Sequence, residues 1–194
     1  IRVEVEESDV YAPITGRDDF LRGDNIEIQL DPWGDGRRGY HFEVSAASSL
    51  LDATINSQGH GDTAWDSQFD AATNIGEQSW TAEVRIPFKS LRFDPARDTW
   101  GLHVFINGWK QEQGLSWAPI DRNVTNRLTQ AGRLTGMAGH KPGRAIEILP
   151  ELTGKWNTEE GKQPACSYDS DIADYTACGA QLSYGLGVKW GLTP

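Results

Sequence analysis

The chain has no long apolar run, few basic residues and only two cysteines, and each shortage narrows the class of protein. Without an apolar stretch of about 20 residues, the sequence contains no transmembrane helix. The net charge of −10 argues against a nucleic-acid partner, because phosphates bind basic surfaces. The motifs GxSxG, HExxH and the phosphate-binding GxxxxGK[ST] are also missing. The sequence therefore offers no recognisable catalytic signature.

The two cysteines, Cys166 and Cys178, fall in one polar segment near the C-terminal end. A disulfide between them would close a short loop and contribute roughly 3 kcal/mol on the loop-entropy account. Such a bond suits an oxidising periplasmic or cell-surface setting. Two unrelated free thiols are the alternative, but the shared loop favours the disulfide. The spacing does not resemble a metal cluster.

Nearly every periodic segment has a period of two, the pattern of strands with one buried face. Apolar residues alternate with polar ones over residues 26–30, 40–44, 80–86 and 100–106. Turn sequences separate them at residues 32–36, 58–62 and 74–76, and short helical turns are predicted only over residues 87–93 and 123–131. We therefore predict an all-β fold, an antiparallel, jelly-roll-like β-sandwich over residues 1–139.

The last third carries longer alternating segments, over residues 145–156 and 180–192. Strands of this length, with Trp156 and Trp190 near their ends, are typical of a lipid-facing barrel wall. A soluble antiparallel sheet with one wet face gives the same alternation. We predict a β-hairpin within residues 145–194 that resembles the first strands of an outer-membrane barrel, after a linker over residues 140–144.

The eight tryptophans divide by position. Trp80 and Trp100 fall on apolar strand faces and are predicted in the core. Others lie in turns or out of phase with the core, where exposed rings suit the C–H faces of sugars, although such rings could also plug the ends of the sandwich. Polar side chains that could bind sugar hydroxyls follow closely. The predicted ligand-binding residues are Trp65, Trp109, Trp117, Glu112, Arg122 and Asn126.

Carboxylates are dense near glycine turns, at Asp18, Asp19, Asp24, Asp31 and Asp35. Hard oxygen ligands of this kind suit calcium, and Asp24, Asp31 and Asp35 are the predicted metal ligands. Their spacing does not match the EF-hand pattern, and no other cofactor is indicated. Paired carboxylates are also the machinery of glycosidases, but no pair stands out in the sequence.

A set of ordered motifs resembles a known family. The motifs are RGDNIEIQLD at residues 22–31, GYHFEV at 39–44, AWD at 64–66, WTAEVRIPF at 80–88, LRF at 91–93, WG at 100–101 and QAGRLTG at 130–136. Together they are similar to family 9 carbohydrate-binding modules in the broad sense. They are most similar to the version found in front of bacterial outer-membrane barrels of unknown function. The resemblance covers essentially the whole chain and makes it look like an internal fragment.

The resemblance implies a non-catalytic, carbohydrate-binding sandwich attached to an outer-membrane barrel, in the periplasm or outer membrane of a bacterial cell envelope. Oligosaccharides or polysaccharides are the implied partners, and relatives attached to xylanases often bind calcium. Two alternatives stay open. The sandwich could be a plug or docking domain of the barrel that binds no sugar, or the chain could be a xylanase-like glycoside hydrolase component.

Overall fold

The computed structural model describes residues 1–110, 113–142, 146–156 and 180–190 of the chain. It divides into two compact units, Ile1–Gly143 and Arg144–Pro194. Within the described residues, none of the helices has the length and apolar character needed to cross a membrane.

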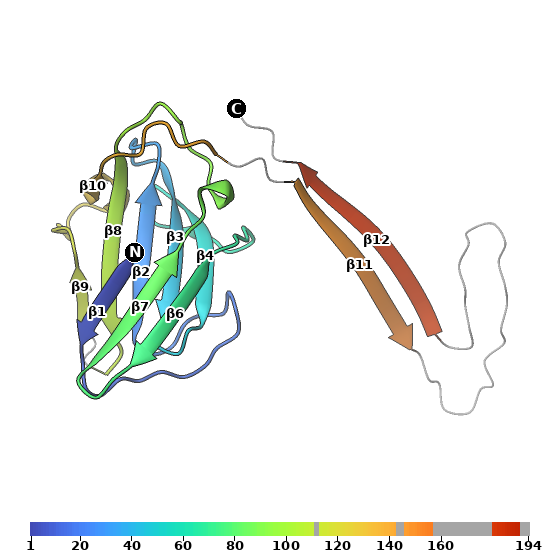
Figure 1. Ribbon diagram of the computed structural model, residues 1–194, viewed down its shortest axis with the longest axis horizontal. Coiled ribbons are helices and arrows are strands. Elements are labelled where there is room, and N and C mark those ends of the chain that lie inside the picture. The colour runs from blue at the N-terminus through green and yellow to red at the C-terminus, as the bar shows by residue number, and fades with distance from the viewer. Residues whose placement is uncertain (111–112, 143–145, 157–179, 191–194) are drawn as a thin grey trace. The chain divides into compact units, whose positions relative to one another are not determined.

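The first unit consists of two antiparallel sheets that face each other (Figure 1). The smaller sheet has the order β1-β7-β6, with β1 at Arg2–Glu6, β6 at Asp70–Ile75 and β7 at Ser79–Arg85. The larger, seven-stranded sheet has the order β10-β8-β2-β3-β4-β5, and β9 also pairs with β8. Its strands are β2 (Asn25–Asp31), β3 (Arg38–Ser45), β4 (Leu50–Asn56), β5 (Gly61–Asp62), β8 (Trp100–Gly108), β9 (Gln113–Ser116) and β10 (Gly132–Leu134).

Alternate residues of these strands form one core between the sheets. Ile26 and Ile28 of β2, which face this core, are fully buried, and Trp80 and Trp100 are 1% and 2% exposed. Burial of apolar surface on this scale is the main force holding the sheets together. The prediction of an all-β antiparallel sandwich is confirmed, and so is the core position of both tryptophans.

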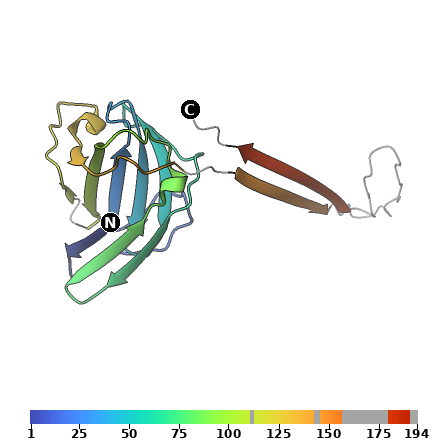
Figure 2. The same cartoon turned by 45° about the horizontal axis from the view of Figure 1, so that its top comes forward.

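Two 3-10 turns interrupt the strands, η1 at Phe88–Ser90 and η2 at Arg127–Gln130, each inside a segment predicted to turn. Figure 2 shows the sandwich from a second angle. The segment between β9 and β10 carries η2, which lies against β2 and β8. Leu128 of η2 is 5% exposed, so this segment is packed onto the larger sheet.

The second unit contains one antiparallel strand pair, β11 (Ile146–Trp156) with β12 (Ala180–Trp190). Its register runs from Ile146 opposite Trp190 to Trp156 opposite Ala180. Three apolar side chains at alternating positions are exposed: Leu152 by 72%, Tyr184 by 80% and Leu186 by 70%. Cys166 and Cys178 lie outside the described residues, so their disulfide stays a prediction.

Candidate functional site

Two half-exposed aromatic rings lie side by side at one end of the sandwich. Tyr11 is 39% exposed and Trp109 is 44% exposed, and their ring centroids are 6.2 Å apart with an interplanar angle of 35°. Tyr11 belongs to the loop after β1, and Trp109 directly follows β8. We call this pair the aromatic platform.

A buried carboxylate holds the two loops that carry the platform. Asp24, the residue directly before β2, is 2% exposed. Its Oδ2 accepts a hydrogen bond from the Tyr11 backbone N–H at 2.9 Å, and its Oδ1 accepts one from the Trp109 N–H at 2.7 Å. The Asp24 N–H in turn donates to the Tyr11 carbonyl at 2.8 Å. One side chain therefore ties together two loops that are 98 residues apart in the sequence.

The neighbours of Asp24 reinforce this arrangement. Gly23 has a φ of 95°, and a Cβ there would lie 2.3 Å from the Tyr11 carbonyl oxygen, so only glycine fits. The Asn107 side chain donates to the Asn25 Oδ1 at 2.8 Å, and Lys110 forms an ion pair with Asp9. The platform is thus positioned before any ligand arrives, which reduces the entropy lost on binding.

The structure does not bring the three predicted site tryptophans together. Trp65 is half-buried, with its ring 4.8 Å from that of Tyr40 and 6.0 Å from that of Phe42, so it covers the core. Trp117 is 59% exposed, and its ring lies over Gly132 of β10. Trp109 alone stands beside a second exposed ring, that of Tyr11. The sequence does not point to Tyr11, because this residue lies in a loop without periodicity.

The structure describes two of the three predicted polar ligand-binding residues, Arg122 and Asn126. Asn126 caps η2 by accepting from the Leu128 N–H at 3.1 Å, and it donates to the Gly36 carbonyl at 2.7 Å. This makes Asn126 a structural residue of the segment that covers β2 and β8. Arg122 is exposed, and Glu112 lies outside the described residues. The ligand-binding roles given to these three residues stay predictions.

The predicted calcium ligands do not form one cluster. Asp24 precedes β2 and Asp31 ends it, which places them about 20 Å apart. Both Asp31 oxygens accept backbone N–H groups, from Trp33, Gly34 and Gly36. Asp35 is exposed and accepts from the Arg37 N–H at 2.9 Å. Asp24 therefore cannot share one calcium ion with Asp31.

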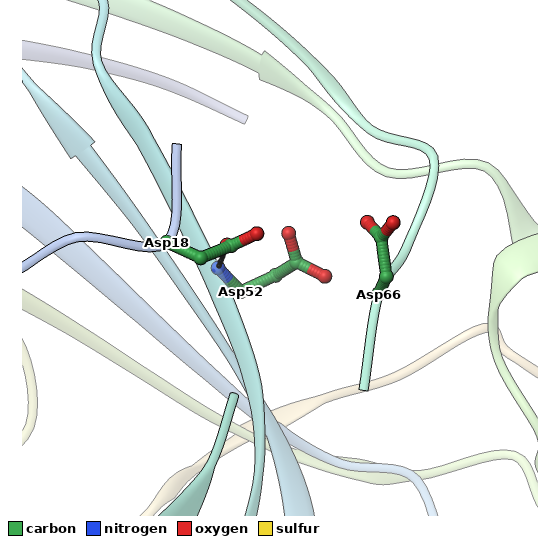
Figure 3. A group of neighbouring side chains, drawn as sticks. All are labelled: Asp18, Asp52 and Asp66. Carbon is green, nitrogen blue, oxygen red and sulfur yellow. Dashed lines mark hydrogen bonds between the residues drawn. The ribbon is translucent and has the colours of Figure 1, made fainter. Parts of the chain in front are cut away.

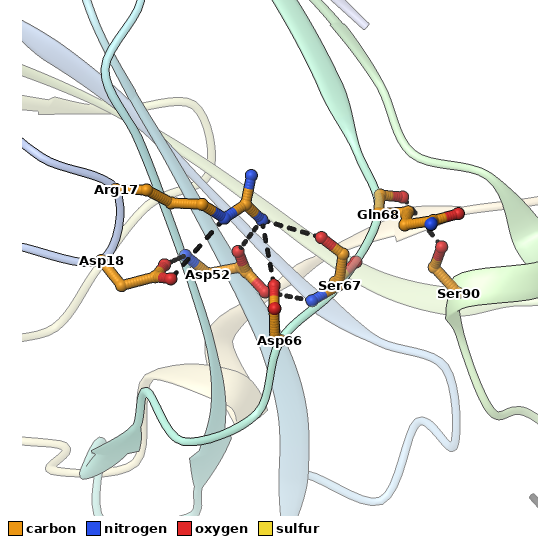
Figure 4. Close-up of polar contacts among 7 residues, drawn as sticks. All are labelled: Arg17, Asp18, Asp52, Asp66, Ser67, Gln68 and Ser90. Carbon is orange, nitrogen blue, oxygen red and sulfur yellow. Dashed lines mark hydrogen bonds and ion pairs between the residues drawn. The ribbon is translucent and has the colours of Figure 1, made fainter. Parts of the chain in front are cut away.

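A different acidic group does gather, formed by Asp18, Asp52 and Asp66 (Figure 3). One ligand oxygen from each lies within 4.8 Å of the others. Arg17 lies among them, with Nη2 2.5 Å from an Asp52 oxygen and 3.4 Å from an Asp66 oxygen (Figure 4). The guanidinium supplies the positive charge that such a group requires. The cluster is therefore a set of ion pairs that joins three segments of the chain.

Burial changes the pKa of one carboxyl in this cluster, that of Asp52. The Asp52 side chain is fully buried, and burial raises the pKa of this carboxyl, against the Arg17 charge and the hydrogen bond from the Ser67 N–H at 2.6 Å. Arg17 also donates to the Ser67 carbonyl at 2.7 Å. The sequence does not predict this group, because its members come from three distant segments and no motif links them.

Comparisons with known proteins give a fold relationship. No family model matches the chain, and no curated protein matches it. Among solved structures, a candidate carbohydrate-binding protein from Bacteroides uniformis ATCC 8492 is similar, with a TM-score of 0.56 and 24% sequence identity. The match covers 69% of this chain and 71% of that one. At this level of identity the likeness establishes a shared fold.

Proposed function

We propose that the first unit is a non-catalytic carbohydrate-binding module and that the aromatic platform is its ligand site. The observation that carries this proposal is the pair of half-exposed rings held by Asp24. Flat rings pack against the C–H faces of sugars, while the indole N–H and phenol O–H bind hydroxyls. The similar fold of the Bacteroides uniformis protein, itself a candidate for carbohydrate binding, supports the same assignment.

The last described residues of the first unit pack away from the platform. Beyond β10, the Met137 N–H donates to the Asp98 carbonyl at 3.0 Å, and His140 stacks on Phe88 with centroids 4.5 Å apart. These contacts lie beside the start of β8, whereas the platform follows the end of that strand. Since β8 has nine residues, the two ends are about 30 Å apart. Within residues 1–142, the platform therefore lies at the opposite end of β8 from these contacts.

Replacing Trp109 tests the ligand site. We expect Trp109→Ala to weaken binding of a responsive soluble oligosaccharide at least tenfold in isothermal titration calorimetry, because stacking energy is lost directly. Tyr11→Phe, which keeps the ring, should weaken it far less than Tyr11→Ala. Trp117→Ala is the matched control, since Trp117 is an exposed tryptophan whose ring lies over Gly132 of β10 and whose backbone N–H donates to the Val104 carbonyl.

Two results would count against this site. Loss of binding in Trp117→Ala with full binding in Trp109→Ala would move the ligand to β9 and β10. A panel of cello-, xylo- and manno-oligosaccharides that produces no heat with the folded protein would favour the alternative in which the sandwich docks on a barrel.

We also propose that the second unit belongs to an outer-membrane barrel, which would place the protein in the bacterial cell envelope. Eleven-residue strands suit a tilted crossing of the hydrocarbon layer. Leu152 opposite Tyr184 and Pro150 opposite Leu186 present apolar residues at alternating positions. Trp156 and Trp190 stand at opposite ends of the pair, the places that interfacial aromatics take.

The two faces of β11 and β12 provide a matched test of this attachment. We expect Leu152→Asp with Leu186→Asp to reduce co-sedimentation of the chain with lipid vesicles several-fold, because charge is costly in hydrocarbon. Thr153→Asp with Ser183→Asp places the same charges on the opposite face and should change little. Equal effects of the two double variants would contradict a lipid-facing side.

A further inference from the structure

One edge of the smaller sheet is open. β1 is the end strand of the order β1-β7-β6 and pairs only with β7. The Ile1 nitrogen donates to the Val84 carbonyl at 2.9 Å, and the Val84 N–H donates back to the Ile1 carbonyl at 2.8 Å. Such exchanges involve every second residue of an antiparallel pair, so the residues between them direct their backbone groups away from β7. The outward N–H and C=O groups of β1 belong to Arg2, Glu4 and Glu6, and no strand in the described part of the chain pairs with this edge.

Two exposed apolar side chains lie on the larger sheet, on the face that is turned toward the core. Leu115 of β9 is directly opposite Ile106 of β8, which packs against the core, so the two share that face. The ring of Trp117 lies over Gly132, which is opposite Leu102, another residue packed against the core. Leu115 and Trp117 are nevertheless 61% and 59% exposed. The smaller sheet therefore does not extend over β9 and β10.

The open edge of β1 and these two side chains lie on the same side of the sandwich (Figure 1). The opposite edge strand, β6, lies against the turn between β3 and β4, where the Thr73 hydroxyl donates to the Ala46 carbonyl at 2.8 Å. β1 lies on the β8 side, because Lys110, which follows β8, forms an ion pair with Asp9, which follows β1. Both β9 and β10 pair with β8, on its side away from β2. A strand added to β1 would extend the smaller sheet over the two exposed apolar side chains.

The outer face of β1 carries negative charge without a counter-charge. Glu4 and Glu6 are exposed, and neither forms an ion pair with the residues that the structure describes, whereas Arg2 is paired with Glu83 of β7 at 3.6 Å. The two valines that alternate with the glutamates pack against the core. Side chains directly opposite each other in paired strands point to the same face. An added strand would therefore meet valines on one face and carboxylates on the other.

We propose that this edge binds an extended segment of another polypeptide as an added strand, in which apolar and basic residues alternate. We define the docking edge as the outward backbone groups of Arg2, Glu4 and Glu6 together with the side chains of Leu115 and Trp117. The backbone of the segment bonds to β1, its apolar side chains cover the exposed apolar pair, and its basic side chains lie beside the two carboxylates. The proposal is independent of glycan binding, since neither ring of the aromatic platform belongs to the docking edge.

The sign of the charge decides between occupants. Charged side chains on an edge strand normally discourage pairing. Here the two uncompensated charges are both negative, so they disfavour an acidic strand and favour a basic one. A second copy of the chain does not suit the edge, because full antiparallel overlap of two β1 strands sets Glu4 of one copy opposite Glu4 of the other, and like charges in that position are destabilising.

Amide hydrogen exchange with peptide probes tests strand addition. The acetylated and amidated peptide KVKVKVK has the proposed alternation, KKVVVKK has the same composition and charge without it, and EVEVEVE reverses the charge. We expect saturable binding of KVKVKVK in isothermal titration calorimetry and at least tenfold weaker binding of the other two. Bound KVKVKVK should slow exchange of the Glu4 and Glu6 amides at least tenfold and change that of Val3 and Val5, which already bond to β7, far less.

Four results would overturn the proposal. Absence of KVKVKVK binding would remove the site, and equal binding of KKVVVKK would reduce it to charge attraction alone. Binding without protection of the Glu4 and Glu6 amides would place the peptide elsewhere on the molecule. A dimer of the chain that forms without peptide in analytical ultracentrifugation, and is lost in Glu4→Pro, would assign the edge to a second copy.

Substitutions separate the parts of the docking edge, with the melting temperature as the check on folding. Glu4→Gln removes the charge and should weaken KVKVKVK binding several-fold. Glu4→Pro also removes the outward N–H, which pairing with β7 does not use, and should weaken binding at least tenfold further. Leu115→Asn should weaken it at least tenfold. The matched control is Ile75→Asn, at an exposed apolar residue of the opposite edge strand β6, and equal affinity of these last two variants would contradict the docking edge.

Discussion

Raising the pH from 6.5 to 9 is expected to lower the free energy of unfolding by about 3 kcal/mol through His41 alone. Its pKa is about 9 in the folded chain, against an ordinary value of 6.5. Below pH 6.5 both states hold the proton and the stabilisation is complete. Between pH 6.5 and 9 only the folded state keeps the proton on His41, so each pH unit lowers the free energy of unfolding by about 1.4 kcal/mol.

Urea denaturation between pH 5.5 and 9.5 measures this slope. Glu27 on β2 and Glu43 on β3 face His41, whereas Ala53 of β4 faces it without charge. His41→Gln should flatten the slope above pH 6.5, and His60→Gln, at an exposed histidine, should leave it intact. A wild-type stability that stays constant up to pH 9 would show that His41 is not held as a cation.

Below pH 6.5 the dependence on pH has the opposite sign, and the free energy of unfolding is expected to fall as the pH falls. Burial lowers the pKa of His103, so the unfolded chain takes up a proton that the folded chain resists as the pH falls below about 6.5. The pKa of Glu27 is lowered despite its burial, because His41 pairs with it, and that contribution is lost under more acidic conditions. Stability is therefore expected to peak near pH 6.5.

Period-two patterns predict the strands well because each strand buries one face. Ile26 and Ile28 reach the core as the alternation requires. The same rule assigns Glu27 and Gln29 to a solvated outer face, whereas the structure buries Gln29 and leaves only 15% of the Glu27 side chain exposed. The reason is non-local: Leu128, about 100 residues later, belongs to the segment packed over this sheet. Local alternation carries no information about such a cover.

The candidate site is harder to predict than the fold because its parts are distant in sequence. Trp109 is identified by its phase relative to the core residues of β8, but nothing near it points to Tyr11. As a carboxylate beside a glycine turn, Asp24 is predicted from the sequence to be a metal ligand. Its actual partners are two backbone N–H groups, 13 and 85 residues away. Residue type alone cannot distinguish these uses of a buried carboxylate.

Removing the Asp24 side chain is expected to lower the free energy of unfolding by about 3 kcal/mol. Asp24→Ala leaves the Tyr11 and Trp109 N–H groups without their acceptor, and each such loss costs about 1–3 kcal/mol when the group is buried. Both groups are only part-buried, so the lower half of the combined range applies. Asp24→Asn keeps one acceptor oxygen and should lose about half as much. Asp35→Ala, at an exposed carboxylate, should change stability by less than about 0.5 kcal/mol.

The same substitution separates a positioning role from a metal role. If Asp24 holds the platform, Asp24→Ala should weaken glycan binding at least tenfold although both rings remain, and Trp109 fluorescence should become less anisotropic. Calcium should then leave the melting temperature of the wild-type chain unchanged. If instead calcium raises that temperature, and Asp24→Ala abolishes the rise without altering Trp109, the carboxylate is a metal ligand. Only the first outcome connects Gly23, Asp24 and Asn25 to ligand binding, because a pre-positioned pair of rings avoids the entropy loss that two free loops would incur.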